Sequence, residues 1–144
     1  MKTIKIIYAG LFIFFISAGL FFFKLKSQEK VRQKAVLAGE MWKVQSNLML
    51  DLRQAHENSI RGVPPDGLWH RRIGFSSARQ GTLEYMVSQG SLFRIQKGKP
   101  LLVSDHIEDL LIRRQKATPD MLEVQVVARK NVTLTSNLKI RIQQ

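Results

Sequence analysis

The sequence predicts an α+β fold in which a long N-terminal transmembrane-to-amphipathic helix packs on an antiparallel β meander. Three observations predict it. Residues 6–23 are apolar and carry no charge, residues 24–58 continue at helical spacing without a proline, and residues 59–144 fall into short alternating runs divided by turns. The 144-residue chain has room for one small domain after the apolar segment.

Residues 6–23 are predicted to form a membrane-spanning helix, preceded by a short basic N-terminus at residues 1–5. At about 1.5 Å per residue a helix of this length spans roughly 27 Å, close to the hydrocarbon thickness of a bilayer. Lysines stand on both sides of it, at Lys2, Lys5, Lys24 and Lys26. We expect an uncleaved signal anchor, and removal as a secretory signal is an alternative.

Residues 24–58 are predicted to continue the anchor as an amphipathic helix. Its apolar residues recur at helical spacing, as Val31, Ala35, Ala38, Met41/Trp42, Leu48/Met49, Leu52 and Ala55. We expect the sheet of the same domain to cover this stripe, and a coiled-coil seam is the less favoured alternative. Trp42 and Trp69 are expected to pack in the core or between helix and sheet.

Residues 59–144 are predicted to form the antiparallel β domain. Alternating apolar residues mark seven strands, around Ile73–Phe75, Leu83–Val87, Leu92–Ile95, Leu101–Val103, Ile107–Ile112, Leu122–Val126 and Leu138–Ile142. Turns are expected at Arg79-Gln80-Gly81, Gln89-Gly90, Lys97-Gly98-Lys99-Pro100, Ala117-Thr118-Pro119-Asp120 and Ser136-Asn137.

The composition gives no sign of catalysis or of a bound cofactor. There is no cysteine, and His56, His70 and His106 are far apart in the chain. The polar group at residues 105–109 is interpreted as a strand-entry turn with solvated acids, with cation binding as the alternative. We therefore expect no enzyme, no catalytic, cofactor-binding or metal-binding residue, and no small-molecule substrate.

The formal net charge of +12 is the unusual feature of the composition. Its basic residues cluster between Lys24 and Lys34 and are otherwise spread in ones and twos. We expect a solvated surface with attraction to lipid headgroups, and nucleic-acid binding is the less favoured alternative.

The chain resembles the type IV pilin-like subunits, and within them the J-type minor pseudopilins of type II secretion systems. The resemblance covers roughly residues 45–127 and rests on short words in order: Asp51-Leu52-Arg53-Gln54-Ala55, Gly81-Thr82-Leu83-Glu84-Tyr85, Leu92-Phe93-Arg94 and Pro100-Leu101-Leu102-Val103. The N-terminus departs from the family, because Phe15 stands where a glutamate should follow a cut after Gly10. Prepilin-type processing is therefore the third alternative for the anchor, and an unprocessed chain is expected.

The resemblance implies a non-enzymatic structural subunit of a type II secretion or pilus-like assembly. Its partners would be other pseudopilin-like or secretion-apparatus membrane subunits and the lipid bilayer. We expect a single-pass inner-membrane protein with a periplasmic β domain, although the surplus of basic residues after the anchor favours the opposite orientation. The expected helix-packing residues are Ala9, Gly10, Ala18, Gly19, Val31, Ala35, Ala38 and Leu52. The alternative function is a membrane-tethered β domain that binds an anionic polymer such as DNA.

Overall fold

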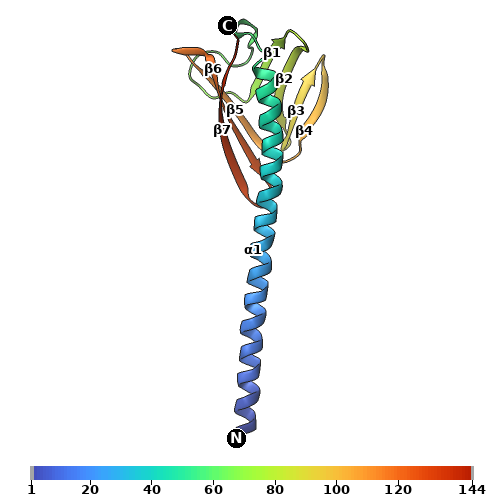
Figure 1. Ribbon diagram of the computed structural model, residues 1–144, viewed down its shortest axis with the longest axis vertical. Helices are drawn as coiled ribbons and strands as arrows, with labels where there is room; N and C mark the ends of the chain where they lie inside the picture. The colour runs from blue at the N-terminus through green and yellow to red at the C-terminus, as the bar shows by residue number, and fades with distance from the viewer. Residues whose placement is uncertain (1, 144) are drawn as a thin grey trace.

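A computed structural model describes the backbone of residues 2–143 and the side chains of residues 19–143. One helix, α1 (Lys2–Leu52), leads into seven strands that form two antiparallel sheets. Figure 1 shows the sheets gathered around the C-terminal end of α1, while its N-terminal part projects away as a stem. The α+β class, with an N-terminal helix packed on antiparallel sheets, is confirmed.

The two sheets follow one another along the chain. The four-stranded sheet has the order β1-β2-β3-β4 and the three-stranded sheet the order β5-β6-β7. The strands are β1 (Arg72–Ser77), β2 (Gly81–Ser88), β3 (Ser91–Gln96), β4 (Lys99–Ser104), β5 (Ile107–Gln115), β6 (Thr118–Arg129) and β7 (Thr133–Arg141). In Figure 1, α1 lies in front of both sheets, with β7 on one side of it and β4 on the other.

The seven predicted runs lie in strands, apart from Ile142, which follows β7, but the strands do not form one meander. The chain leaves the first sheet after β4 and starts the second at Ile107, so each sheet is a separate meander. The turn expected at Ser136-Asn137 is wrong, because both residues pair with β6 inside β7. Asn137 accepts a cross-strand hydrogen bond from the Gln125 side chain at 3.0 Å, and the turn lies at residues 130–132 instead.

One hydrophobic core joins the helix to both sheets. The helix contributes Leu37, Met41, Val44, Leu48 and Leu52, at spacings of three and four residues. These side chains pack on inward-facing residues of the strands, among them Phe75, Tyr85, Leu92, Leu110, Val124 and Ile140. Contact with both sheets therefore fixes the C-terminal third of α1.

The helix ends at Leu52, and the expected end at residue 58 is wrong. Residues 55 and 56 are extended and form bridges to Ser77 and Gln143. The Gln143 N–H donates to the Ala55 carbonyl at 3.0 Å, and the Glu57 N–H donates to the Gln143 carbonyl at 2.8 Å. Backbone groups of the sheets thus replace the helical partners, which is why α1 stops before the glycine and proline breakers.

Of the predicted anchor at residues 6–23, the side chains of residues 6–18 lie outside the described ones, which begin at Gly19. In the part of the chain with described side chains, no helix is long and apolar enough to span a membrane.

Candidate assembly interface

A second apolar face of α1 is turned away from the sheets. It consists of Val31, Ala35, Ala38 and Trp42, at successive spacings of four, three and four residues, and all four side chains are exposed. We name these four residues the outer helix strip. Val31 is 66% exposed and Trp42 is 71% exposed, so the expectation that Trp42 packs in the core or on a sheet is wrong.

The outer helix strip and the core face are rotated relative to each other on the same helix. The sequence pattern had merged them into one stripe, because residues of both faces recur at three and four. Leu52, one of the expected packing residues, belongs to the core face and is fully buried by its own sheets. It is therefore covered and cannot meet another subunit.

The strip suits close approach of a second helix. Ala35 and Ala38 are small, and the neighbouring Gly39 has open space around it, with no atom within 4 Å of an added Cβ. Small side chains let two helix axes come near the short end of the usual range of about 8–10 Å. Trp42 then offers a large apolar surface beside the small ones.

The stem from residue 19 to residue 36 is exposed except for the partly buried Gln33. Its start is apolar around the whole circumference, at Leu20, Phe21, Phe22 and Phe23. Gly19 is exposed and has open space around it. Val31, Ala35 and Ala38 share one face further along, whereas Ala9, Gly10 and Ala18 lie outside the described side chains.

A buried polar cluster joins α1 to the first sheet. Asp51 Oδ2 accepts hydrogen bonds from Tyr85 Oη at 2.7 Å and from Arg94 Nε at 2.6 Å. Arg94 also donates to Gln96 Oε1 at 3.0 Å and to the Gln80 side chain. The three central residues lie in three of the segments that carry the family resemblance, and they fix the rotation of the helix on the sheet.

Sequence reasoning missed this cluster as a unit. Its only signal is an acid at position 51 on the core face of the helix, where an apolar residue is the rule. Burial raises the pKa of Tyr85, and its hydrogen bond to Asp51 adds to the shift. The hydrogen bond to Asp51 raises the pKa of Arg94. The Tyr85 phenol therefore stays neutral and the Arg94 guanidinium stays charged. This suits a role in holding the structure together and does not suit proton transfer.

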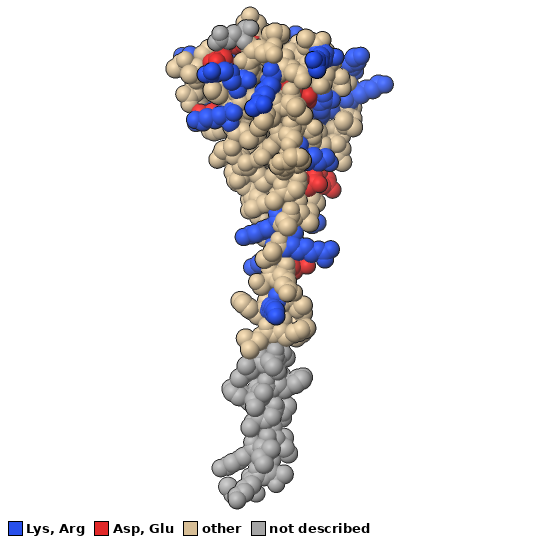
Figure 2. Space-filling view, viewed as in Figure 1, with Lys and Arg blue, Asp and Glu red and all other residues tan. Residues whose placement is uncertain are grey.

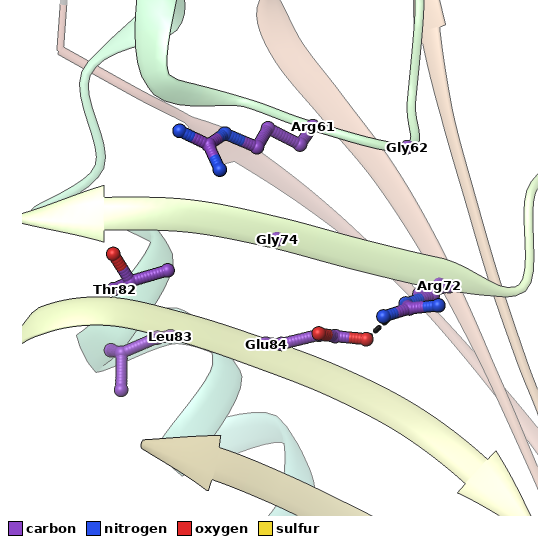
Figure 3. A pocket seen from close by; sticks show the side chains of 7 residues that line it. All are labelled: Arg61, Gly62, Arg72, Gly74, Thr82, Leu83 and Glu84. Atoms are coloured by element: carbon purple, nitrogen blue, oxygen red, sulfur yellow. Dashed lines mark ion pairs between the residues drawn. The ribbon is translucent and has the colours of Figure 1, made fainter. Parts of the chain in front are cut away.

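A shallow hollow of about 350 Å³ lies beside β1 and β2. Figure 3 shows Arg72 on β1 directed at Glu84 on β2, and Arg61 on the segment that runs along the outside of β1. Two of the seven lining residues are cations, Arg61 and Arg72. Arg72 is paired with Glu84, whereas Arg61 has no carboxylate partner among the described residues.

The acids of residues 105–109 face basic side chains. Glu108 Oε1 lies 2.7 Å from Arg129, Asp109 Oδ2 lies 3.2 Å from Arg71, and Asp105 Oδ1 lies 3.6 Å from His106. Within the described side chains, no three acidic or histidine residues come together as a metal site. His56, His70 and His106 take part in separate contacts. Asp105 and His106 lie just before β5, as a strand-entry turn requires, but Glu108 and Asp109 lie inside the strand and are ion-paired.

No protein-family model matches the chain, and no curated protein matches it.

Proposed function

We propose that the chain is a non-enzymatic structural subunit of a pilus-like or type II secretion assembly. Residues 6–23 anchor it in the inner membrane, the head projects into the periplasm, and α1 packs against the helices of other subunits. The resemblance to J-type minor pseudopilins and the pilin-like arrangement of a stem helix on antiparallel sheets both favour this function.

The observation that carries the proposal is the outer helix strip. Val31, Ala35, Ala38 and Trp42 form an apolar row on a face of the helix that its own sheets leave open. Burying an apolar side chain stabilises a protein by roughly 25 cal/mol for each Å² of apolar surface removed from water. An exposed apolar side chain lacks this stabilisation. A contiguous exposed row of this kind is typical of a surface that meets another protein.

Photo-cross-linking in the native cells tests the proposal. A photoreactive amino acid is placed at position 38 or 42, and position 135, exposed on β7, is the control. We expect adducts from positions 38 and 42 whose cross-linked peptide, sequenced by mass spectrometry, is the N-terminal helix of another membrane subunit. Adducts only from position 135, or only with lipid, would contradict the proposal.

A paired substitution then separates packing from folding. Ala35→Glu together with Ala38→Glu places two charges on the strip, and Thr135→Glu with Asn137→Glu places two on the exposed side of β7. All four positions are exposed, so both variants should fold. We expect the helix variant alone to lose co-purification with the cross-linked subunit.

The anchor is tested separately. Mass spectrometry of the mature N-terminus distinguishes an intact anchor from a chain cut after Gly10 or after residue 19. Protease added to each side of the membrane then shows which side holds the head. A head that is cleaved only from the cytoplasmic side would refute the periplasmic placement.

The alternative function, binding of an anionic polymer, has one observation in its favour. Every acid from residue 51 to residue 143 lies within ion-pair distance of a basic side chain. Among the described residues of the head, Lys97, Lys99, Lys116 and Lys130 have no such partner, and neither do Arg53, Arg61 and Arg79. The unneutralised charge of the head is therefore spread over separate lysines and arginines. Figure 2 shows basic side chains gathered at the far end of the head.

A further inference from the structure

A groove of about 420 Å³ runs between α1 and β4, on a different face of the helix from the outer strip. From the helix it is lined by Lys43, Asn47, Leu50 and Asp51, from the turn after the helix by Gln54, and from β4 by Leu101, Leu102 and Val103. Leu50 is 63% exposed and Leu101 is 60% exposed, so the apolar walls face open solvent.

The edge of β4 is open, whereas two other sheet edges are closed by the chain itself. Arg61 exchanges two backbone hydrogen bonds with Gly74 on β1, at 2.6 and 3.0 Å, and His70 exchanges two with Ile112 on β5, at 2.7 and 2.8 Å. Across residues 2–143, no backbone hydrogen bond reaches β4 from outside its ladder with β3. An open apolar edge is a template for a further strand.

Pro100 indicates which backbone groups of β4 point outward. Proline is tolerated in a strand where its missing N–H faces away from the ladder. Because the backbone groups of alternate residues in an antiparallel strand point to opposite sides, the N–H and C=O of Leu102 then point away from β3, at the open edge. Leu102 lies in the middle of the groove wall and would provide the central pair of hydrogen bonds to a docked strand.

The charge around the groove is positive. Asp51, its only lining carboxylate, is already neutralised by Arg94 and hydrogen-bonded by Tyr85. Lys43 lies on one wall, and an adjoining hollow that shares Arg94 and Leu101 adds Lys97 and Lys99. A docked segment with acidic side chains would therefore gain from these lysines, and a basic one would be repelled.

We propose that the β4 edge binds an extended segment of a different protein, with alternating acidic and apolar side chains, as a fifth strand of the first sheet. Backbone pairing with β4 supplies affinity, and the leucine walls and the lysines supply selectivity. A second copy of this chain is the wrong occupant. The chain carries a net charge of +12, and its stem between Lys24 and Lys34 has five basic residues against one acid.

Peptide binding to the full-length chain in detergent micelles tests the proposal. The probe is a fluorescent capped peptide of about eight residues with alternating glutamate and valine, long enough to cover the strand. Two matched peptides replace glutamate by lysine or methylate the backbone nitrogens of alternate residues. Fluorescence anisotropy should give binding of the acidic peptide at least about tenfold tighter than of either matched peptide.

Variants of the chain locate the site. Leu102→Pro removes the outward N–H and should abolish binding, whereas Leu102→Ala keeps the N–H and should retain more of it. Lys97→Glu with Lys99→Glu should weaken binding about tenfold. Lys116→Glu with Lys130→Glu changes the net charge equally outside the groove and should leave binding unchanged. Leu101→Ser should weaken it, and Leu68→Ser, at a position 64% exposed elsewhere, should not.

Three results would overturn the proposal. The first is equal affinity for the acidic and the backbone-methylated peptide, since that would exclude strand pairing. The second is equal weakening by the two lysine pairs, which would indicate diffuse charge attraction. The third is loss of binding in Leu102→Ala as complete as in Leu102→Pro, with both variants showing the circular dichroism of the unmodified chain. None of these results bears on the outer helix strip, so the proposed function would stand or fall separately.

Discussion

At the scale of single residues, Asp51 holds the helix in register on the first sheet. Its carboxylate is 8% exposed and accepts hydrogen bonds from two different strands, through Tyr85 on β2 and Arg94 on β3. Substitution of the acid leaves the guanidinium of Arg94 with no carboxylate in a largely buried site. A buried charge without its partner destabilises a protein far more than the intact pair stabilises it.

We predict that Asp51→Ala lowers the free energy of unfolding by about 3–5 kcal/mol. Tyr85→Phe removes one hydrogen bond and keeps the ion pair, so it should cost only about 1 kcal/mol. Denaturant titration of the full-length chain in micelles, followed by far-ultraviolet circular dichroism, measures both. Equal losses in the two variants would mean that the Asp51–Arg94 ion pair adds nothing.

The same cluster predicts a dependence on alkaline pH. Burial and Asp51 raise the pKa of Tyr85 above the value of about 10 expected in an unfolded chain. Its contribution is therefore complete below pH 10 and is lost as the pH rises further, because only the unfolded state then releases the proton. The unfolding free energy should fall by about 1.4 kcal/mol per pH unit in this range.

Tyr85→Phe is the control for that dependence. Lysines titrate in the same pH range, so only the difference between the two proteins reports on Tyr85. Parallel curves for the two proteins between pH 9 and about pH 11 would contradict the raised pKa.

At the scale of secondary-structure elements, α1 presents different faces to the core, the groove and solvent. Leu48 is fully buried against the sheets, and Leu50, two positions later, is 63% exposed in the groove. We predict that Leu48→Ala lowers the unfolding free energy by about 2–5 kcal/mol, through lost burial and a cavity. Leu50→Ala should change it by less than about 0.5 kcal/mol. Thermal denaturation of both variants checks the assignment, and similar losses would mean that the helix is rotated from the position described.

The strands were predictable because their signal is local. Every run with a period of two became a strand, and Gln89-Gly90 and Lys97-Gly98 supply positive φ at both positions of two tight turns. The predictions that were wrong concern features that depend on partners far away in the sequence. Ser136 and Asn137 have turn chemistry, but nine consecutive pairs with β6 extend the strand through them. The division into two sheets depends on which strands pair with each other in space, and the sequence of a single strand does not determine its partner.

The candidate interface was predictable only in part. Val31, Ala35 and Ala38 were expected packing residues and share an exposed face. Leu52 was assigned with them because three- and four-residue spacing does not say which of two neighbouring faces the sheets will cover. The groove beside β4 and the Asp51 cluster bring helix residues together with strand residues more than thirty positions away, so only the fold could reveal them.

At the scale of the whole molecule, the described head combines many ion-paired side chains with a few lysines and arginines that have no acidic partner. The stem between Lys24 and Lys34 is basic along its length, as suits a helix leaving a layer of lipid phosphates. In the head, most arginines form ion pairs with acidic side chains, and Figure 2 shows the two signs of charge interleaved there. The net charge alone therefore does not indicate a nucleic-acid site. Whether the unpaired basic residues bind a polyanion has to be measured.

Heparin retention against salt supplies that test for the full-length chain in micelles. A dedicated polyanion site makes several phosphate-like contacts at once, and each contributes about 0.7–0.9 to the slope of log affinity against log salt. If binding used the β3–β4 turn, Lys97→Glu with Lys99→Glu would lower that slope by about two units, and Lys116→Glu with Lys130→Glu would leave it nearly unchanged. We expect the two pairs to lower it by equal amounts, because single lysines on separate turns act as independent charges in a solvated surface. If only Lys97→Glu with Lys99→Glu lowered the salt dependence of binding, the result would favour the polymer-binding alternative over the structural subunit.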